Sequence, residues 1–202
     1  MDVQRPLPRL PLLHLMAGTI VLLAALLAGP VAVRADSFVL LATYDGVINP
    51  VTAEYLHDAL LSAQDNGAQA LIIRLNTPGG LDPSMRLIIK DITAATIPVV
   101  VYVAPSSSRA ASAGLFITMA AHVAAMAPGT NIGAAHPVAI GGGEMDKTMK
   151  EKVENDSVAY LKSITSQRGR NVAWVEDAVR KSVSVTEREA LKLKIIDLVA
   201  EN

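Results

Sequence analysis

Short apolar runs alternate with helix-like segments along most of the chain, and this alternation limits the fold more than any other feature of the sequence. Residues 70–75 and 99–103 are nearly uninterrupted apolar runs, which is typical of buried strands. Between them, residues 82–95 have a helical pattern. Strands that alternate with helices favour parallel pairing. The sequence therefore predicts an α/β fold with mainly parallel strands and surrounding helices.

Cap and turn residues place the other elements. A helix is expected to begin at Pro50, after a cap at Asn49, and to end at Asn66-Gly67. Its expected apolar face is Val51, Tyr55, Leu56, Ala59 and Leu60. The remaining expected elements are strands at 37–43, 122–127 and 195–199, extended chain over 131–137, a mobile loop at Gly141–Gly143, helices over 145–167 and 171–181, and a last short helix opened by the capping box at 186–189.

The amino terminus has the pattern of an export signal. Arg5 and Arg9 precede the uncharged apolar residues 10–28, and Ala35 ends a small-residue cleavage site. The apolar run also reaches the roughly 18 to 20 residues that can span a bilayer, so a retained membrane anchor is the alternative. We expect residues 1–35 to be a signal peptide or anchor, and residues 36–202 to be one exported domain, periplasmic or extracellular.

Composition excludes several classes of protein. The chain has no cysteine, which excludes thiol catalysis and cysteine-ligated zinc. Its 18 basic and 19 acidic residues leave a net charge of -1, and aromatic residues make up only 3%. Both observations speak against nucleic-acid binding. No metal or organic cofactor is predicted.

A lone serine among very small residues is the candidate nucleophile. Ser112 stands in Arg109-Ala-Ala-Ser-Ala-Gly-Leu-Phe, after the apolar run 99–103 and before residues with helical character. Small neighbours let a substrate backbone approach, and a helix N-terminus favours negative charge on a substrate oxygen. The alternative is that Ser112 only caps the helix, because serine is a common cap.

A pair of glycines follows the other buried run. Gly79 and Gly80 come after residues 70–75, at the edge where α/β sheets place their sites. Their N–H groups, with that of Ala113, form a candidate oxyanion hole, although Pro-Gly is also a common turn. Because both loops follow neighbouring strands, they are expected to converge on one edge of the sheet.

The base that would activate the serine remains open on the residues alone. His136 follows small residues and could reach the cleft, and His122 is a second histidine in this region. The helix predicted over 145–167 has an apolar stripe of Met145, Met149, Val153, Tyr160 and Ile164. This periodicity places Lys147 toward water but does not choose between Lys150 and Lys152.

Four motifs, in order, are similar to those of the NfeD family of membrane-bound serine proteases. They are Asn76-Thr-Pro-Gly-Gly80, Arg109-Ala-Ala-Ser-Ala-Gly114, Met126-Ala-Pro-Gly-Thr-Asn-Ile-Gly-Ala-Ala135, and a segment from Lys152 to Asn171 that contains Arg168-Gly-Arg. Members are also called stomatin operon partner proteins and belong to the ClpP/crotonase-like class.

The resemblance implies an exported serine endopeptidase with a ClpP/crotonase-like fold. It implies that Ser112 is the nucleophile, Lys152 the general base and the Gly-Gly loop the oxyanion hole. It also implies cleavage of apolar segments in stomatin-like membrane proteins, membrane association and a homo-oligomer. A lysine base must be neutral, so we expect Lys152 to be buried beside Met149 and Val153, whereas Asp156 would oppose this if it faced the same cleft.

Two departures from the family keep alternatives open. Full-length members continue into membrane helices and a small β-barrel domain, so the chain is expected to be a short form or a fragment. His136 stands close to the position where ClpP proteases have their catalytic histidine, which leaves a Ser-His protease open. The other alternative is a non-catalytic scaffold. A crotonase-like acyl-CoA enzyme does not fit, because the chain is expected to be exported and its sequence does not suggest a basic pocket for a nucleotide.

Overall fold

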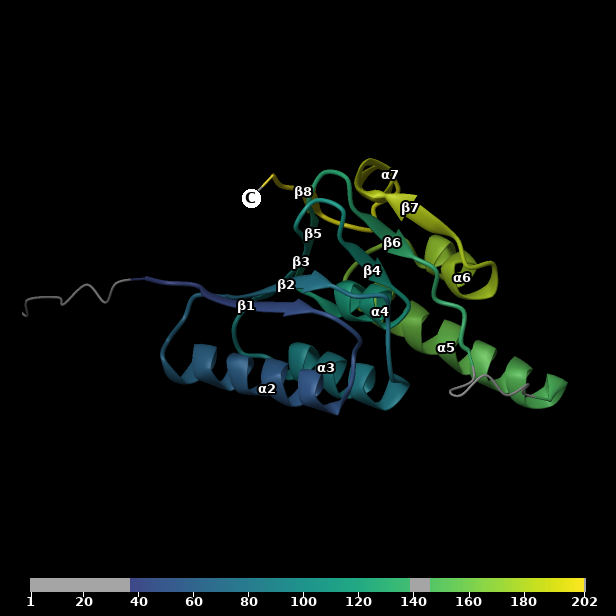
Figure 1. Ribbon diagram of the computed structural model, residues 1–202, viewed down its shortest axis with the longest axis horizontal. Helices are drawn as coiled ribbons and strands as arrows, with labels where there is room; N and C mark the ends of the chain where they lie inside the picture. Colours follow the sequence, from purple (N-terminus) through teal and green to yellow (C-terminus); the bar gives the residue numbers. More distant parts are fainter. Residues whose placement is uncertain (1–36, 139–145, 202) are drawn as a thin grey trace, which may run out of the picture. The chain divides into compact units, whose positions relative to one another are not determined.

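Five parallel strands form the main sheet of the protein (Figure 1). The computed structural model describes residues 37–138 and 146–201. Every neighbouring pair in this sheet is parallel, which confirms the predicted α/β class. In spatial order the strands are β1 (Leu40–Asp45), β2 (Leu71–Asn76), β3 (Val99–Val103), β5 (Val123–Met126) and β8 (Leu198–Val199).

Two helices, α2 (Pro50–Asp65) and α3 (Asp82–Ala94), lie side by side on one face of this sheet, and α2 contacts β1 and β2 (Figure 1). Helix α2 begins at the predicted cap, where Asn49 and Thr52 form a capping box. Helix α3 agrees with the predicted segment. The predicted apolar face of α2 is partly wrong, because Val51 is 72% exposed and Tyr55 is also exposed. Leu56 and Leu60 are buried as predicted, together with Ala53 and Ala63.

A second, three-stranded sheet was not predicted. It consists of β4 (Arg109–Ala111), β6 (Asn131–Gly133) and β7 (Ser184–Thr186). β4 and β6 are parallel, and β6 and β7 are antiparallel. Each strand has three residues, too few for an alternating apolar pattern to identify it. This sheet matters for function because β4 leads directly into Ser112.

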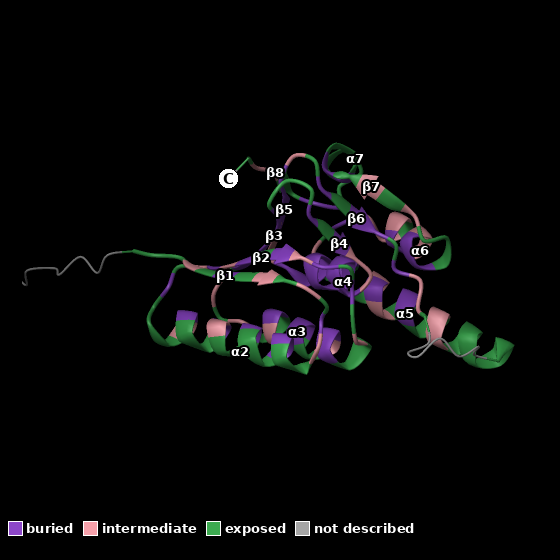
Figure 2. Cartoon of the chain, viewed as in Figure 1, coloured by how far each residue is buried: buried purple, intermediate pink, exposed green. Residues whose placement is uncertain are grey.

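The later helices differ strongly in burial (Figure 2). All eight residues of α4 (Ala113–Ala120) are buried. In α5 (Lys147–Gln167) the buried residues begin only at Ser157, and Met149 of the predicted stripe is 48% exposed. The first turns of α5 extend past the neighbouring elements, so periodicity alone placed the buried face too far toward the amino terminus. Helices α6 (Val172–Arg180) and α7 (Glu187–Lys192) follow, the latter with the predicted capping box.

Some predictions fall outside the described residues, namely the signal or anchor at 1–35 and the loop at Gly141–Gly143. The last strand is shorter than predicted, because Ile195 and Ile196 are buried but precede it. Within residues 37–138 and 146–201, no helix combines the length and apolar character needed to cross a membrane.

Candidate active site

Ser112 joins β4 to α4 in an unusual backbone conformation. Its φ is 52° and its ψ is -116°, a positive φ that costs a residue with a Cβ about 1–3 kcal/mol. Its N–H donates to the Gly133 carbonyl (3.0 Å), and its carbonyl accepts from Leu115 N–H (2.9 Å). The hydroxyl makes no capping hydrogen bond. The capping explanation for this serine is therefore wrong, and the strained backbone presents a hydroxyl that has no hydrogen-bond partner among the described residues.

The glycine loop lies directly against Ser112, as predicted. A Cβ added to Gly79 would lie 2.6 Å from the Ser112 Cβ and 3.2 Å from its Oγ. Thr77 holds the two loops together, because its N–H donates to the Arg109 carbonyl (2.8 Å) and its carbonyl accepts from Ala111 N–H (3.1 Å). Only a glycine leaves room for the serine at this contact.

The backbone donors of this loop are not equivalent. Gly79 N–H donates to Thr77 Oγ1 (3.1 Å), so the prediction that Gly79 offers a free oxyanion donor is wrong. Among the hydrogen bonds of the described residues, the N–H groups of Gly80 and Ala113 have no partner. Gly80 is pressed against the Ile48 backbone, which leaves no space for a Cβ. Gly80 and Ala113 thus offer free donors beside the serine.

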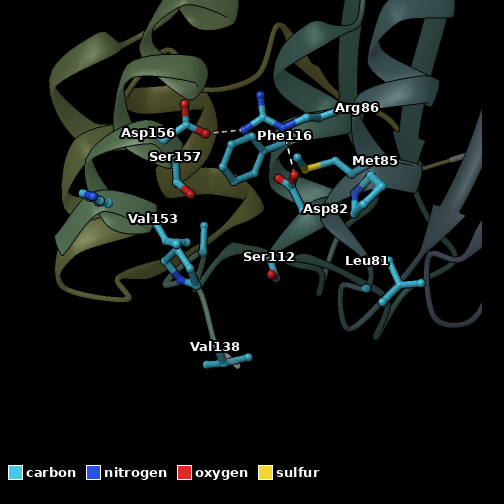
Figure 3. Close-up of a pocket in the computed structure, with 15 residues that line it drawn as sticks. Leu81, Asp82, Met85, Arg86, Ser112, Phe116, Val138, Val153, Asp156 and Ser157 are labelled. Atoms are coloured by element: carbon cyan, nitrogen blue, oxygen red, sulfur yellow. Dashed lines mark hydrogen bonds and ion pairs between the residues drawn. The ribbon is translucent and has the colours of Figure 1, made fainter. Parts of the chain in front are cut away.

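A cleft of about 470 Å³ opens at Ser112 (Figure 3). Gly80 and α3 form one wall, and α5 forms the opposite wall. In Figure 3, Leu81 and Val153 lie on opposite sides of Ser112, and Phe116 and Met85 lie beyond it. Its lining is mostly apolar and comprises Gly80, Leu81, Asp82, Pro83, Met85, Arg86, Ser112, Phe116, Ala135, Pro137, Val138, Lys152, Val153, Asp156 and Ser157.

The structure distinguishes the two candidate lysines. Lys152 lines the cleft together with Ser112 and Gly80, whereas Lys150 is exposed and does not line it. The expected burial of Lys152 is wrong, because the residue is exposed in the part of the chain that the structure describes. Val153 is half-buried, but Met149 leaves the lysine uncovered. Lys152 thus lines the cleft, and the described residues leave it exposed.

Neither candidate histidine lines the cleft. Ala135 and Pro137 do, but His136 between them has its Nδ1 3.1 Å from the Val179 carbonyl of α6. His122 lies at the opposite end of α4, where its Nδ1 accepts a hydrogen bond from Val99 N–H (3.2 Å). The structure therefore does not bring His136 together with Ser112.

A charged cluster at the far end of the cleft was not found from the sequence. Arg86 donates through Nε to Asp82 (2.8 Å) and through Nη2 to Asp156 (2.5 Å), as the dashed lines of Figure 3 show. Its guanidinium carbon also lies 4.2 Å from the centre of the Tyr160 ring. Burial opposes the charge, but the two carboxylates outweigh it and raise the pKa of Arg86. The i,i+4 spacing to Asp82 was the one local signal that could have indicated part of this cluster.

Two arginines hold the other end of the serine helix. Arg170 Nη1 donates to the carbonyls of Met119 and Ala121 (3.0 Å each), and Arg168 Nε donates to that of Ala120 (2.8 Å). Arg170 Nη2 also binds Asp197 (2.5 Å). Cations at this end satisfy free carbonyls and complement the helix dipole. The Arg168-Gly-Arg motif thus fixes α4, whose first residue follows Ser112.

The described residues hold no group of three or more histidine, aspartate or glutamate side chains arranged for a metal ion. The Ser112 hydroxyl, Gly80 and the Lys152 amine lie at a single cleft, and the Ala113 N–H follows the serine directly. These are the groups required for acyl transfer through a covalent intermediate.

A family model described as "NfeD1b, N-terminal domain" matches residues 41–202. The chain belongs to this family. Its similarity extends to "Membrane-bound protease PH1510" of Pyrococcus horikoshii, 37% identical over 178 residues, which are 87% of this chain and 40% of that protein. "Membrane protein NfeD1b" of Bacillus subtilis is 42% identical over 83 residues, 41% of this chain and 18% of that protein. The chain thus spans less than half the length of these relatives.

Solved structures confirm the ClpP-like fold of this NfeD1b-family domain. A serine-to-alanine mutant of the 1510-N membrane-bound stomatin-specific protease has a TM-score of 0.77 at 36% identity, covering 83% of this chain and 82% of that one. A lysine-to-alanine mutant of 1510-N in complex with a substrate peptide has a TM-score of 0.78, covering 83% and 77%. ClpP1 from Listeria monocytogenes shares the fold, with a TM-score of 0.65 at 21% identity. The match covers 80% of this chain and 91% of ClpP1.

Proposed function

We propose that this domain is a serine endopeptidase with a Ser112-Lys152 dyad. The observation that carries the proposal is that Ser112, Lys152 and Gly80 line one cleft. The 37% identity to a membrane-bound protease supports it, as does the likeness to a stomatin-specific protease studied as serine and lysine mutants.

The proposed reaction uses the free groups at the cleft. Ser112 Oγ attacks the peptide carbonyl carbon while neutral Lys152 Nζ takes the hydroxyl proton. The N–H groups of Gly80 and Ala113 donate hydrogen bonds to the oxyanion. Lys152 then gives the proton to the leaving amine, and water hydrolyses the acyl-enzyme by the same steps. The described residues leave Lys152 exposed, and a bound substrate that covers it would favour the neutral amine.

The proposed substrate is an extended apolar segment of a stomatin-like membrane protein. Leu81, Phe116 and Val153 give the cleft apolar walls on both sides of the serine. Apolar side chains gain free energy when such walls exclude water. The export pattern of residues 1–35 supports an enzyme outside the cytoplasm and at the membrane, and its relatives are named membrane proteins. The homo-oligomer remains a prediction.

The decisive test is hydrolysis of a quenched fluorescent apolar peptide, together with labelling by a serine-directed phosphonate. We expect the phosphonate to label Ser112 and Ser112→Ala to reduce kcat/KM by about 10⁴-fold or more. The free energy of unfolding of the Ser112→Ala variant should stay within about 0.5 kcal/mol of the wild type, since the Ser112 hydroxyl makes no capping hydrogen bond. A folded Ser112→Ala variant with wild-type turnover would rule out Ser112 as the nucleophile. A wild-type protein without turnover or labelling would support the scaffold alternative.

Matched lysine variants test the base. Lys152→Ala should lose activity, and Lys150→Ala, two residues away on the exposed helix, should keep it. His136→Ala should also keep activity, because His136 does not line the cleft. Loss of activity in His136→Ala with a normal Lys152→Ala would make the enzyme a Ser-His protease.

A further inference from the structure

Among the described residues, the first turns of α5, which carry Lys152, are exposed, whereas the rest of the helix packs against α4 and α6. Residues 146–152 are all exposed, and the first fully buried residue of α5 is Ser157. The position of Lys152 therefore depends on the next turn, residues 153–157. Val153, Asp156 and Ser157 of this turn line the cleft.

Charged residues from two neighbouring helices contact this turn. From α3, Arg86 binds Asp156 (2.5 Å) and lies over the Tyr160 ring. From α6, Arg180 donates to Glu154 (2.8 Å) and Asn155 (2.9 Å). Only Arg86 lines the cleft, so it faces the same space as Lys152.

Asp156 follows Lys152 at the i,i+4 spacing, where opposite charges on one helix attract each other. A carboxylate paired with the lysine would favour the ammonium form, which cannot accept a proton. In the structure the Asp156 carboxylate is instead bound to Arg86. The other charged groups that line the cleft are Asp82, which also binds Arg86, and Lys152 itself.

We propose that Arg86 is a positioning residue that binds Asp156, holding the Lys152 turn at the cleft and keeping this carboxylate from pairing with the lysine. This inference rests on the proposed Ser112-Lys152 mechanism. The Asp156 side chain is 67% exposed, and such pairs contribute little to folding. The effect of Arg86 is therefore on catalysis rather than on stability.

The test is the pH profile of kcat/KM for Arg86→Met, Asp156→Asn and the double variant. Arg86→Met should lower kcat about 10-fold near neutral pH with little change in KM, and should move the alkaline rise of activity up by about one pH unit. Adding Asp156→Asn should return the pH profile toward the wild type, since no carboxylate is then left to pair with Lys152. Arg180→Met removes the other arginine of this turn without changing the cleft, and should leave the profile in place.

Several outcomes would overturn the proposal. An unchanged pH profile in Arg86→Met would show that Arg86 does not act through Asp156. A rise in KM without a change in kcat, not rescued by Asp156→Asn, would assign Arg86 to substrate binding instead. Lys152→Ala is measured in the same assay: if it retains wild-type activity, the dyad is wrong, whereas an inactive Lys152→Ala with a normal Arg86→Met rejects only the positioning role.

Discussion

The two halves of the proposed dyad are built differently. The serine half is a fully buried helix, α4. The residues just before it, Ala111 and Ser112, donate their N–H groups to the carbonyls of Thr77 and Gly133, and its last carbonyls accept from two arginines. The lysine half is the exposed start of α5, held beside the cleft mainly by partly exposed ion pairs. Figure 2 shows this contrast, with α4 buried and the start of α5 exposed.

The contrast shows which part of the site is already in place in the folded protein before a substrate binds. A nucleophile with a strained backbone and free N–H donors needs a rigid surrounding to persist. The neutral form of a catalytic lysine can instead be favoured by the substrate, because substrate binding removes the water around the amine. The serine half should therefore be sensitive to packing changes, and the lysine half to charge changes.

The largest expected effect on the serine half comes from Arg170→Met. The side chain of Arg170 is only 3% exposed, and its loss leaves the carbonyls of Met119 and Ala121 and the carboxylate of Asp197 without this partner. Each of the two buried carbonyls left without its donor costs about 1–3 kcal/mol, whereas the lost ion pair adds little because the Asp197 side chain is 41% exposed. Chemical denaturation should show this loss. Arg168→Met, which removes one bond from a half-buried arginine, should cost only about 1 kcal/mol.

Gly79→Ala should displace Ser112 or the glycine loop that it contacts. The new Cβ would lie 2.6 Å from the Ser112 Cβ, so one of the two loops must move. We expect a loss of about 1–3 kcal/mol of stability and about 100-fold in kcat/KM. Gly67→Ala is the matched control. Both glycines have a positive φ, 118° at Gly79 and 72° at Gly67, but no atom lies within 4 Å of a Cβ added to Gly67. If both variants keep full activity, the close contact between the loops does not matter for catalysis.

Hydrogen exchange compares the two halves directly. Amides of α4 should exchange only on global unfolding, and those of residues 147–156 should exchange by local opening. Arg180→Met should speed exchange of the α5 turn at Glu154 while leaving α4 unchanged. Equal protection of both helices, measured by mass spectrometry, would show that α5 is as firmly held as α4.

The smallest expected effect is a pH dependence near α4. Burial, and then Arg168 and Arg170, lower the pKa of His122 from its ordinary value of 6.5. The unfolded chain then binds a proton more readily than the folded chain, so the stabilisation from neutral His122 is complete above pH 6.5 and is lost as the pH falls toward the lowered pKa. The thermal midpoint of His122→Gln should fall less between pH 7.5 and pH 5 than that of the wild type. Parallel decreases would exclude this role for His122.

The sequence by itself determined the main sheet, the principal helices and the meeting of Gly79 with Ser112. Apolar runs, caps and parallel order are local signals, and parallel strands must end at one edge of the sheet. The four motifs added the family, and the resemblance favoured Lys152 where helical periodicity had left Lys150 open.

Only the tertiary structure decided how the side chains of the site are used. The short strands β4, β6 and β7 exist through pairing between distant segments, and that pairing sets the backbone of Ser112. The Gly79 N–H is taken by Thr77, His136 turns to Val179, and Arg86 binds Asp156 from another helix. These hydrogen-bond and ion-pair partners depend on which segments meet in space, and contacts between distant segments leave no local pattern in the sequence.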